Sequence, residues 1–423
     1  MGSSSQQVVV NRRPRPGRGP RALRQWVDDL TAPREGVEPI RSGTLTKVVG
    51  IWAVGRAVNF LLIWLFFEIS RLADLGFGPH GIHVRHFLTF LTGWDADHYL
   101  SIAEVGYPVR LPIEGGVVQE NDWAFLPVLP FIERTVHDLT GVDAGVVGVF
   151  VSVAASLGAT LALFLLLREV TTPSAAWWGM VLFTFAPLSF VFVLAYAESL
   201  FLFLTFTALL LTLRRKYLWV LPIGVLAAYT RPGILALALA LGIVFVVRWL
   251  RRSADPFPWR ERISLAATGL AIAVAGLSWT WIADLVTGEP QAYLRTEMAW
   301  WVPLVGEGAF VPLTPWFRFF GTYLGVFGIL FVLAVMAAFA WWMFSRPVRR
   351  LGLVVVAFAA SYGLYLFGVF LPQQSTFRLM MPLSPLLGDE RFSATRNRRQ
   401  WLLLGSLALQ VVAVFLLWTI GYP

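Results

Sequence analysis

The chain begins with a polar segment and continues as a long series of apolar runs. Residues 1–46 are rich in Arg, Pro, Gly and Ser and lack the apolar core of a signal peptide. From residue 47 on, apolar runs of about the 20 residues that cross a bilayer as a helix follow one another. The pattern predicts a flexible, basic cytoplasmic arm over residues 1–46 and an all-α polytopic membrane domain over residues 47–423.

Eleven crossings are predicted, and three of them are shorter than a membrane-spanning helix should be. One apolar stretch, Leu218–Val247, is interrupted by Thr230-Arg231-Pro232-Gly233 and has basic residues at both ends, which predicts a hairpin with Arg231 at its tip. Short or broken helices are tolerated only where protein or a water-filled cavity satisfies their backbone, so they indicate a buried polar cavity. The predicted spans are Val48–Ile69, Ala144–Leu167, Ala175–Ala195, Glu198–Leu213, Leu218–Tyr229, Ile234–Val247, Ile263–Val286, Phe319–Phe344, Leu351–Leu371, Phe377–Leu387 and Trp401–Ile420.

Composition and charge support a membrane protein. Apolar residues make up 57% of the chain and charged residues 14%, which excludes disorder and argues against one large soluble enzyme. The absence of Cys excludes disulfide, zinc-thiolate and thiol-nucleophile chemistry. The net charge of +9 is carried mainly by Arg, as expected of a GC-rich, actinobacterial source. Most Lys and Arg fall in loops that the positive-inside rule assigns to the cytoplasm, with the N-terminus inside. The basic excess therefore reports membrane topology, and no nucleic-acid partner is expected.

Two long loops fall on the outer side in this topology, and loops of such length usually carry function. The first long loop is Ser70–Asp143 and the second long loop is Thr287–Arg318. Their large apolar side chains are predicted to anchor at the membrane surface, as aromatic belts do. These residues are Trp94, Tyr99, Trp123, Phe125, Leu126, Phe131, Trp300, Trp301, Trp316 and Phe317.

The stretch Gly93–Tyr107 in the first long loop predicts a short amphipathic helix on the membrane, with Asp95 at its start. Asp95 has two interpretations, an N-cap or a general base beside Trp94 that accepts a proton from a sugar hydroxyl. Asp97 is the second candidate for the base, with a solvated helix face as the alternative. Asp95 and Asp97 also form a D-x-D pattern, which is weak evidence for metal without a nucleotide-binding domain.

All five His residues lie in the first long loop. The spacing of three among His80, His83 and His86 could support a metal site, although His at a membrane interface more often holds no metal. The other two, His98 and His137, stand apart from that run.

Around Asp95 the sequence resembles the GPI mannosyltransferase II (PIG-V) family, whose first loop reads W-D-A/G-x-H-Y/F-L-x-I-A-x-x-G-Y. Trp94–Tyr107 matches this motif without a mismatch and includes His98. Five further similarities follow in order along the chain, with single departures at Leu126, Glu289 and Leu379. They are Phe125–Pro130 (F-F-P-x-x-P), Tyr196–Phe201 (Y-x-E-S-L-F) with Thr230–Pro232 (T-R-P), Gly288–Trp300 (G-D-P…W) and Ser375–Arg378 (S-x-x-R-Y).

The resemblance implies a GT-C glycosyltransferase fold and a polyprenyl-phosphate (or dolichyl-phosphate) mannose donor. It also implies inverting transfer of mannose to a lipid-linked glycan on the extracytoplasmic face of the cell membrane, with Asp95 as the base. A lipid phosphate then leaves at headgroup depth, where its charge needs cations. We expect Arg378 and Arg231 to bind that phosphate; a structural pair with Glu198 or with a backbone carbonyl is the alternative for each. For Arg56, inside a span, the structural interpretation is favoured. No cofactor and no metal are expected, because single displacement needs one base.

Two other functions compete with the transferase. A lipid or glycolipid transporter or flippase would explain eleven spans, but it predicts internal repeats and polar residues near the bilayer midplane. A structural scaffold would leave the acids of the first long loop unexplained. The transferase is favoured because the polar residues cluster at the outer face.

Overall fold

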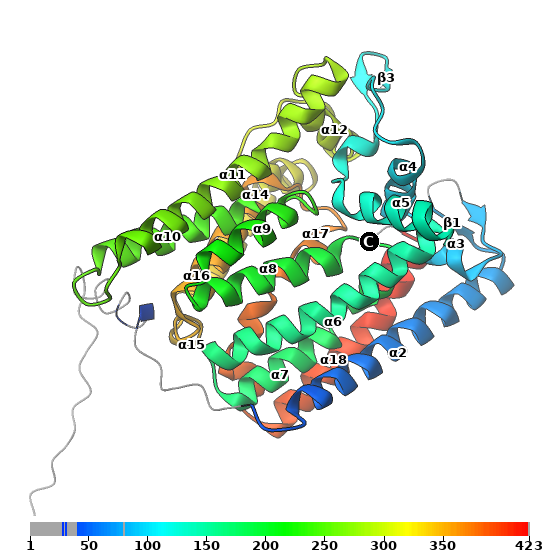
Figure 1. Ribbon diagram of the computed structural model, residues 1–423. Coiled ribbons are helices and arrows are strands. Elements are labelled where there is room, and N and C mark those ends of the chain that lie inside the picture. The colour runs from blue at the N-terminus through cyan, green and yellow to red at the C-terminus, as the bar shows by residue number, and fades with distance from the viewer. Residues whose placement is uncertain (1–27, 29, 32–39, 79–80, 422–423) are drawn as a thin grey trace, which may run out of the picture.

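The computed structural model describes residues 28, 30–31, 40–78 and 81–421, so most of the predicted arm and His80 lie outside the described residues. The rest is mostly helical, and the strands form two small antiparallel hairpins. The prediction of an all-α membrane protein is confirmed (Figure 1). The α-helices are α2 (Thr44–Leu72), α3 (Phe87–Leu91), α4 (Asp95–Val105), α5 (Val128–Thr140), α6 (Ala144–Val170), α7 (Pro173–Thr184), α8 (Glu198–Leu213), α9 (Tyr217–Ala228), α10 (Leu235–Leu250), α11 (Trp259–Thr287), α12 (Ala292–Ala299), α13 (Val302–Val305), α14 (Pro315–Met343), α15 (Arg346–Arg349), α16 (Gly352–Val369), α17 (Thr376–Leu379) and α18 (Arg396–Ala413). The strands are β1 (Gly76–Phe77), β2 (Ile82–His83), β3 (Ile113–Glu114) and β4 (Val117–Val118), and the remaining helical turns are η1 (Asp122–Ala124), η2 (Ser189–Val193), η3 (Met381–Gly388), η4 (Glu390–Ser393) and η5 (Val414–Thr419).

Among the described residues, six helices are long and apolar enough to cross a membrane. They are α2, α6, α11, α14, α16 and α18 with its continuation η5, while α8, α9 and α10 are apolar but shorter. The predicted interruption at residues 230–233 separates α9 from α10. Two of the eleven predicted spans are wrong as continuous helices, and a third, residues 319–344, is kinked at Gly325 within α14. Residues 175–195 divide into α7 and η2, and residues 377–387 form the single turn α17 followed by the 3-10 segment η3. Pro382 and Pro385 explain the second break, because proline removes a backbone donor from a helix interior.

The first break lies at Pro187, since the residue before a proline is disfavoured in the α conformation. Two side chains from other spans take the carbonyl groups that the break frees. Arg56 Nη2 of α2 donates to the carbonyl of Thr184 at 2.8 Å, and Gln410 Nε2 of α18 donates to that of Ala186 at 3.3 Å. Arg56 is buried and its guanidinium lies 4.7 Å from the centre of the Phe192 ring. These contacts support the structural interpretation of Arg56.

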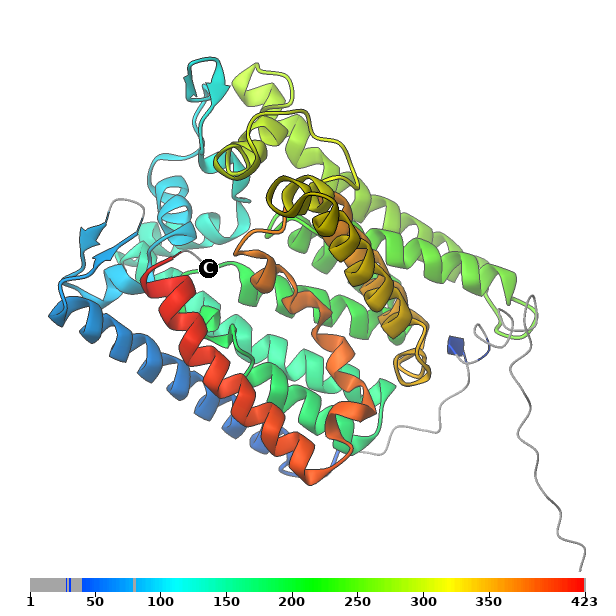
Figure 2. The same cartoon turned by 180° about the vertical axis from the view of Figure 1, so that it is seen from behind.

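The bundle places both long loops at one end. α8 packs between α6 and α9, α10 packs against α11 and α16, and a continuous apolar core fills the space between them. The turns between α6 and α7, α8 and α9, and α10 and α11 lie at the opposite end from α4 and α12 (Figure 1). The reverse view shows α14 and α18 on the side of the bundle that faces away in Figure 1 (Figure 2). Asn121 Nδ2 of the first long loop donates to Thr296 Oγ1 of the second at 2.9 Å, so the two loops form one unit.

The prediction that the aromatic residues of the loops are interfacial anchors is wrong for several of them. Trp123, Tyr99 and Trp301 are buried, and Trp123 packs with Trp279 of α11. Phe131 is exposed, as an anchor requires. The difference arises because the loops fold over one another and over the ends of the spans, so that their apolar side chains build a core of their own.

Candidate active site

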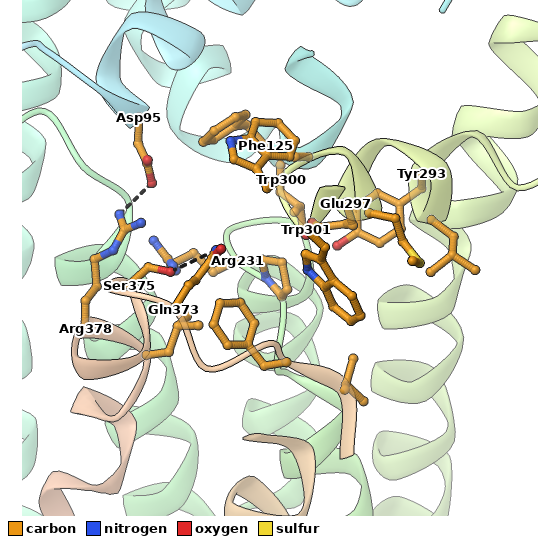
Figure 3. A pocket seen from close by; sticks show the side chains of 18 of the residues that line it. Asp95, Phe125, Arg231, Tyr293, Glu297, Trp300, Trp301, Gln373, Ser375 and Arg378 are labelled. Atoms are coloured by element: carbon orange, nitrogen blue, oxygen red, sulfur yellow. Dashed lines mark hydrogen bonds and ion pairs between the residues drawn. The ribbon is translucent and has the colours of Figure 1, made fainter. Parts of the chain in front are cut away.

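A cavity of about 220 Å³ opens where the two long loops meet one end of the spans. Its wall combines side chains from α4, η1, the turn between α9 and α10, α12, the end of α16 and α17 (Figure 3). It is therefore lined by segments far apart in the sequence. The lining residues used below are Asp95, Phe125, Arg231, Tyr293, Glu297, Trp300, Trp301, Tyr365 and Arg378.

Asp95 enters this cavity as the first residue of α4. The N-cap position is Trp94, so the N-cap interpretation of Asp95 is wrong. The residue before it, Trp94, has a φ of 59°, an uncommon conformation for a residue with a side chain. The backbone N–H of Asp95 donates to the Tyr196 hydroxyl at 3.1 Å, and its carboxylate is thereby left to face Arg378. Strained backbone of this kind clusters at functional sites.

Two carboxylates and two guanidinium groups form one connected network. Arg378 Nη1 lies 2.5 Å from Asp95 Oδ2 and 3.0 Å from Glu198 Oε1. Arg231 Nη1 lies 2.5 Å from the same Glu198 oxygen. The side chains of Glu198 and Arg378 are 4% and 6% exposed, whereas that of Asp95 is 22% exposed. Glu198 also begins α8, where the helix dipole favours a negative charge.

Both arginines pair with Glu198, which is the structural alternative predicted for them from the sequence. It does not exclude a phosphate role, since Arg378 and Arg231 also line the cavity. A buried group of two cations and two anions is balanced, so an incoming anion would have to displace one of the carboxylates. Asp95 is the more exposed of the two.

The other predicted site residues lie outside the cavity lining. Asp97 is exposed on α4. The ring of His98 stacks on Phe125 with centres 4.4 Å apart, and His98 Nδ1 lies 2.7 Å from Asp122 Oδ1. Trp94 Nε1 donates to the carbonyl of Trp418 at 3.2 Å. His98 and Trp94 therefore support the walls: His98 orients a cavity-lining ring, and Trp94 holds the start of α4 against the last span.

One acid of the cavity was missed by the sequence reasoning. Glu297 of α12 lines the cavity together with Tyr293 of the same helix. Burial raises the pKa of Glu297 to about 7. The only signal in the sequence was its position between the Gly288-Glu289-Pro290 motif and the Trp300-Trp301 pair.

Within residues 28, 30–31, 40–78 and 81–421, no three His, Cys, Asp or Glu side chains come together as metal ligands. His83 Nδ1 lies 2.9 Å from Asp74 Oδ1, and His137 Nδ1 lies 2.8 Å from the carbonyl of Val142. Independence of metal remains a prediction.

Glu133 of α5 is a second acid with an unusual environment. It is fully buried, and neither carboxylate oxygen has a hydrogen-bond partner among the described residues. Burial raises the pKa of Glu133 to about 8. A Cβ at Gly148 of α6 would lie 2.2 Å from Glu133 Oε1, so the absence of a side chain at Gly148 makes room for this carboxyl group.

The raised pKa of Glu133 predicts a pH dependence of stability. Between its ordinary pKa of about 4.5 and about 8, the folded chain binds a proton that the unfolded chain has released, so stability falls as pH rises through this range. We expect thermal unfolding of the purified protein to move to lower temperature from pH 5 to pH 8. Glu133→Gln should flatten that dependence. An equal slope in the variant would show that Glu133 is already ionised in the fold.

Comparison with known proteins confirms the family resemblance over part of the chain. Residues 81–240 match the model of the family described as Mannosyltransferase (PIG-V). This segment contains Asp95, Glu198 and Arg231, while Glu297 and Arg378 lie beyond it.

Curated relatives match a similar share of the chain. Human GPI alpha-1,6-mannosyltransferase 2 is 28% identical over 153 residues, which are 34% of this chain and 29% of the relative. The same protein of Cricetulus griseus is 29% identical over 136 residues, 30% of this chain and 26% of the relative. The alignments thus span less than a third of either relative's length.

Solved structures with a similar arrangement include ArnT from Cupriavidus metallidurans in the apo state. It superposes with a TM-score of 0.45 at 13% identity, over 89% of this chain and 65% of that chain. The oligosaccharyltransferase AglB from Archaeoglobus fulgidus, in complex with an inhibitory peptide and a dolichol-phosphate, gives a TM-score of 0.40 at 14% identity, over 88% and 56% of the two chains.

Proposed function

We propose that the chain is a membrane-embedded GT-C mannosyltransferase, which moves mannose from a polyprenyl-phosphate mannose to a hydroxyl of a lipid-linked glycan. The observation that carries the proposal is the cavity in which the partly exposed carboxylate of Asp95 meets the cations Arg378 and Arg231. The match of residues 81–240 to a mannosyltransferase family supports the type of reaction.

The reaction follows from these groups as a single displacement with inversion. The acceptor hydroxyl oxygen attacks C1 of the mannose while the bond from C1 to the phosphate oxygen breaks. Asp95 takes the hydroxyl proton as general base, and the electron pair of the broken bond goes to the phosphate. Arg378 and Arg231 stabilise the negative charge that develops on the leaving phosphate. The products are the new glycoside and polyprenyl phosphate.

The ion pair of Asp95 with Arg378 gives donor binding a second effect. A phosphate that reaches Arg378 competes with Asp95 for the same Nη1 atom. When the phosphate takes over this contact, the Asp95 carboxylate is released from Arg378 and can accept a hydrogen bond from the acceptor hydroxyl. Donor binding thus frees the base for the acceptor.

The placement of charge supports one orientation in the membrane. The basic turns Arg214–Lys216 and Arg248–Arg252 lie at the end of the bundle opposite to the cavity (Figure 1). With these turns in the cytoplasm, as the positive-inside rule requires, the cavity opens on the extracytoplasmic face. Nucleotide sugars are not supplied there, which favours a lipid-linked donor.

The test uses the full chain, purified and reconstituted in lipid vesicles with radiolabelled polyprenyl-phosphate mannose. We expect release of polyprenyl phosphate together with transfer of mannose to a glycolipid, at an unchanged rate in EDTA. Loss of activity in EDTA would contradict metal independence. Passage of intact donor across the vesicle membrane without cleavage would instead favour the transporter or flippase. Lipid analysis after gene deletion should reveal a precursor one hexose short, which identifies the acceptor.

A further inference from the structure

The cavity has two chemically different walls. Arg378 and Arg231, with Asp95, form the first, and Figure 3 shows the pair Asp95–Arg378 on one side of the space. On the other side, Glu297 and Tyr293 project from α12. We call this second side the α12 wall. The proposed function uses the first wall alone.

Glu297 is surrounded by groups that do not neutralise it as the arginine network neutralises Glu198. Tyr293 lies beside it on the same helix and lines the same cavity. The charged and titratable groups that face Glu297 from other elements are Arg231 of the α9–α10 turn, Asp95 of α4 and Tyr365 of α16. Burial opposes its ionisation and Arg231 favours it. Such a carboxyl group keeps acceptor capacity for a ligand in the cavity.

The chemistry of the α12 wall suits a sugar and disfavours a phosphate. A carboxylate repels an anionic phosphate but accepts hydrogen bonds from neighbouring hydroxyls of a neutral sugar. Phe125, Trp300 and Trp301 line the same cavity and offer flat apolar surfaces to the C–H faces of a pyranose ring. A hexose presents hydroxyls at its edge and C–H groups on its face. The carboxyl group suits the hydroxyls, and the aromatic rings suit the C–H face.

A second cavity adjoins the α12 wall. It measures about 440 Å³ and shares Leu294, Met298 and Phe310 with the first cavity. Polar residues of the second long loop, among them Gln291 and Arg295, line it together with the β3–β4 turn. A glycan whose terminal hexose lies at the α12 wall approaches the reacting carbon from the side away from Arg378, as displacement requires, and the second cavity lies next to that side.

We propose that the α12 wall is the acceptor subsite, which holds the terminal hexose of the acceptor, and that Glu297 determines its specificity by accepting hydrogen bonds from the sugar hydroxyls. This inference rests on the proposed function, and it adds which side of the cavity takes the acceptor and which residue recognises it. Glu297 positions the acceptor, while Asp95 remains the base.

Donor hydrolysis separates this inference from the proposed function, because water needs no sugar subsite. The full chain in lipid nanodiscs is given polyprenyl-phosphate mannose, with or without n-octyl α-D-mannopyranoside as acceptor probe. For Glu297→Gln we expect kcat/KM for the octyl mannoside to fall about 10- to 100-fold through KM, the range for a lost hydrogen bond to a charged group. Hydrolysis of the donor should stay within about twofold of the wild-type rate, since it does not use this hydrogen bond. Glu104→Gln, on an exposed position of α4, is the matched control and should change neither rate.

The pH profile gives a readout that a structural role of Glu297 would not move. In the wild type, KM for the octyl mannoside should rise as pH falls from 8 to 6, because Glu297 becomes protonated, and Glu297→Gln should remove that rise. Glu297→Asp keeps the charge and should recover part of the transfer, which covers the case in which the Gln variant folds poorly.

Three results would overturn the inference. One is an equal loss of hydrolysis and transfer in both Glu297 variants, and another is unchanged transfer in Glu297→Gln. The third is a wild-type protein that hydrolyses the donor but does not use the octyl mannoside, since the wall then takes no hexose of this kind. If the wild type releases no mannose from the donor at all, the proposed function itself has failed.

Discussion

Replacing Asp95 with asparagine is expected to lower mannose transfer by about a hundred- to ten-thousandfold, the usual contribution of a general base. Asparagine keeps the size of the side chain and can still accept a hydrogen bond from Arg378, but it cannot take the proton of the acceptor hydroxyl. Donor binding should persist or tighten, because Arg378 no longer has to release a carboxylate before it binds phosphate. Transfer rates and equilibrium binding of radiolabelled donor, measured on the same preparation, test both parts.

Asp97→Asn is the comparison within the same helix turn. Asp97 is exposed on α4 and lies outside the cavity lining, so its substitution should leave transfer close to the wild-type rate. Transfer at the wild-type rate in Asp95→Asn would show that Asp95 is not the base. A large loss in Asp97→Asn instead would move the base to the residue that the sequence left as second candidate.

The sequence indicated Asp95 as a candidate base because the motif around it is a short, continuous segment. The residues that contact Asp95 in the fold come from distant parts of the chain. Arg378 stands 283 positions away, and their 2.5 Å contact follows from the packing of α17 beneath α4. Sequence reasoning placed Arg378 and Arg231 near the outer interface from helix breaks and basic ends. It could not tell that one oxygen of Glu198 serves both, because that contact depends on how α8 begins between two other segments.

The helical spans were predictable where apolar runs are long, and unreliable where proline interrupts them. The run from Ala175 to Ala195 has the length of a crossing, yet its backbone turns at Pro187. The fold tolerates this turn because Arg56 and Gln410 supply donors from α2 and α18. Partners so distant in sequence leave no trace in a hydropathy pattern.

Glu297 shows a different limit. An acid in a polar loop is most often solvated, and nothing in its immediate sequence distinguishes Glu297 from Glu307. The position of Glu297 follows from the second long loop folding over the first, where Asn121 donates a hydrogen bond to Thr296, the residue before Glu297. The same folding buries Trp123 and Trp301, which the sequence alone assigned to the membrane surface.

Glu198→Gln is expected to destabilise the fold by about 3–5 kcal/mol, the range for breaking a buried ion pair from one side. Glutamine keeps the shape of the side chain but leaves the buried guanidinium groups of Arg231 and Arg378 with Asp95 as the remaining anion of the network. Thermal unfolding of the detergent-purified protein measures the effect. Glu68→Gln removes the surface pair with Arg71 and should cost at most about 1 kcal/mol.

The same variant tests where the donor phosphate binds. Polyprenyl phosphate adds a negative charge, so at Arg378 and Arg231 it would replace the charge that Glu198→Gln removes. A ligand that binds the folded state more tightly raises the unfolding temperature more. Polyprenyl phosphate should therefore raise the unfolding temperature of Glu198→Gln more than that of the wild type or of Glu68→Gln. If polyprenyl phosphate raises the unfolding temperature of all three proteins equally, the phosphate binds away from the two arginines. If Glu198→Gln without ligand unfolds at the same temperature as Glu68→Gln, the network contributes little to stability.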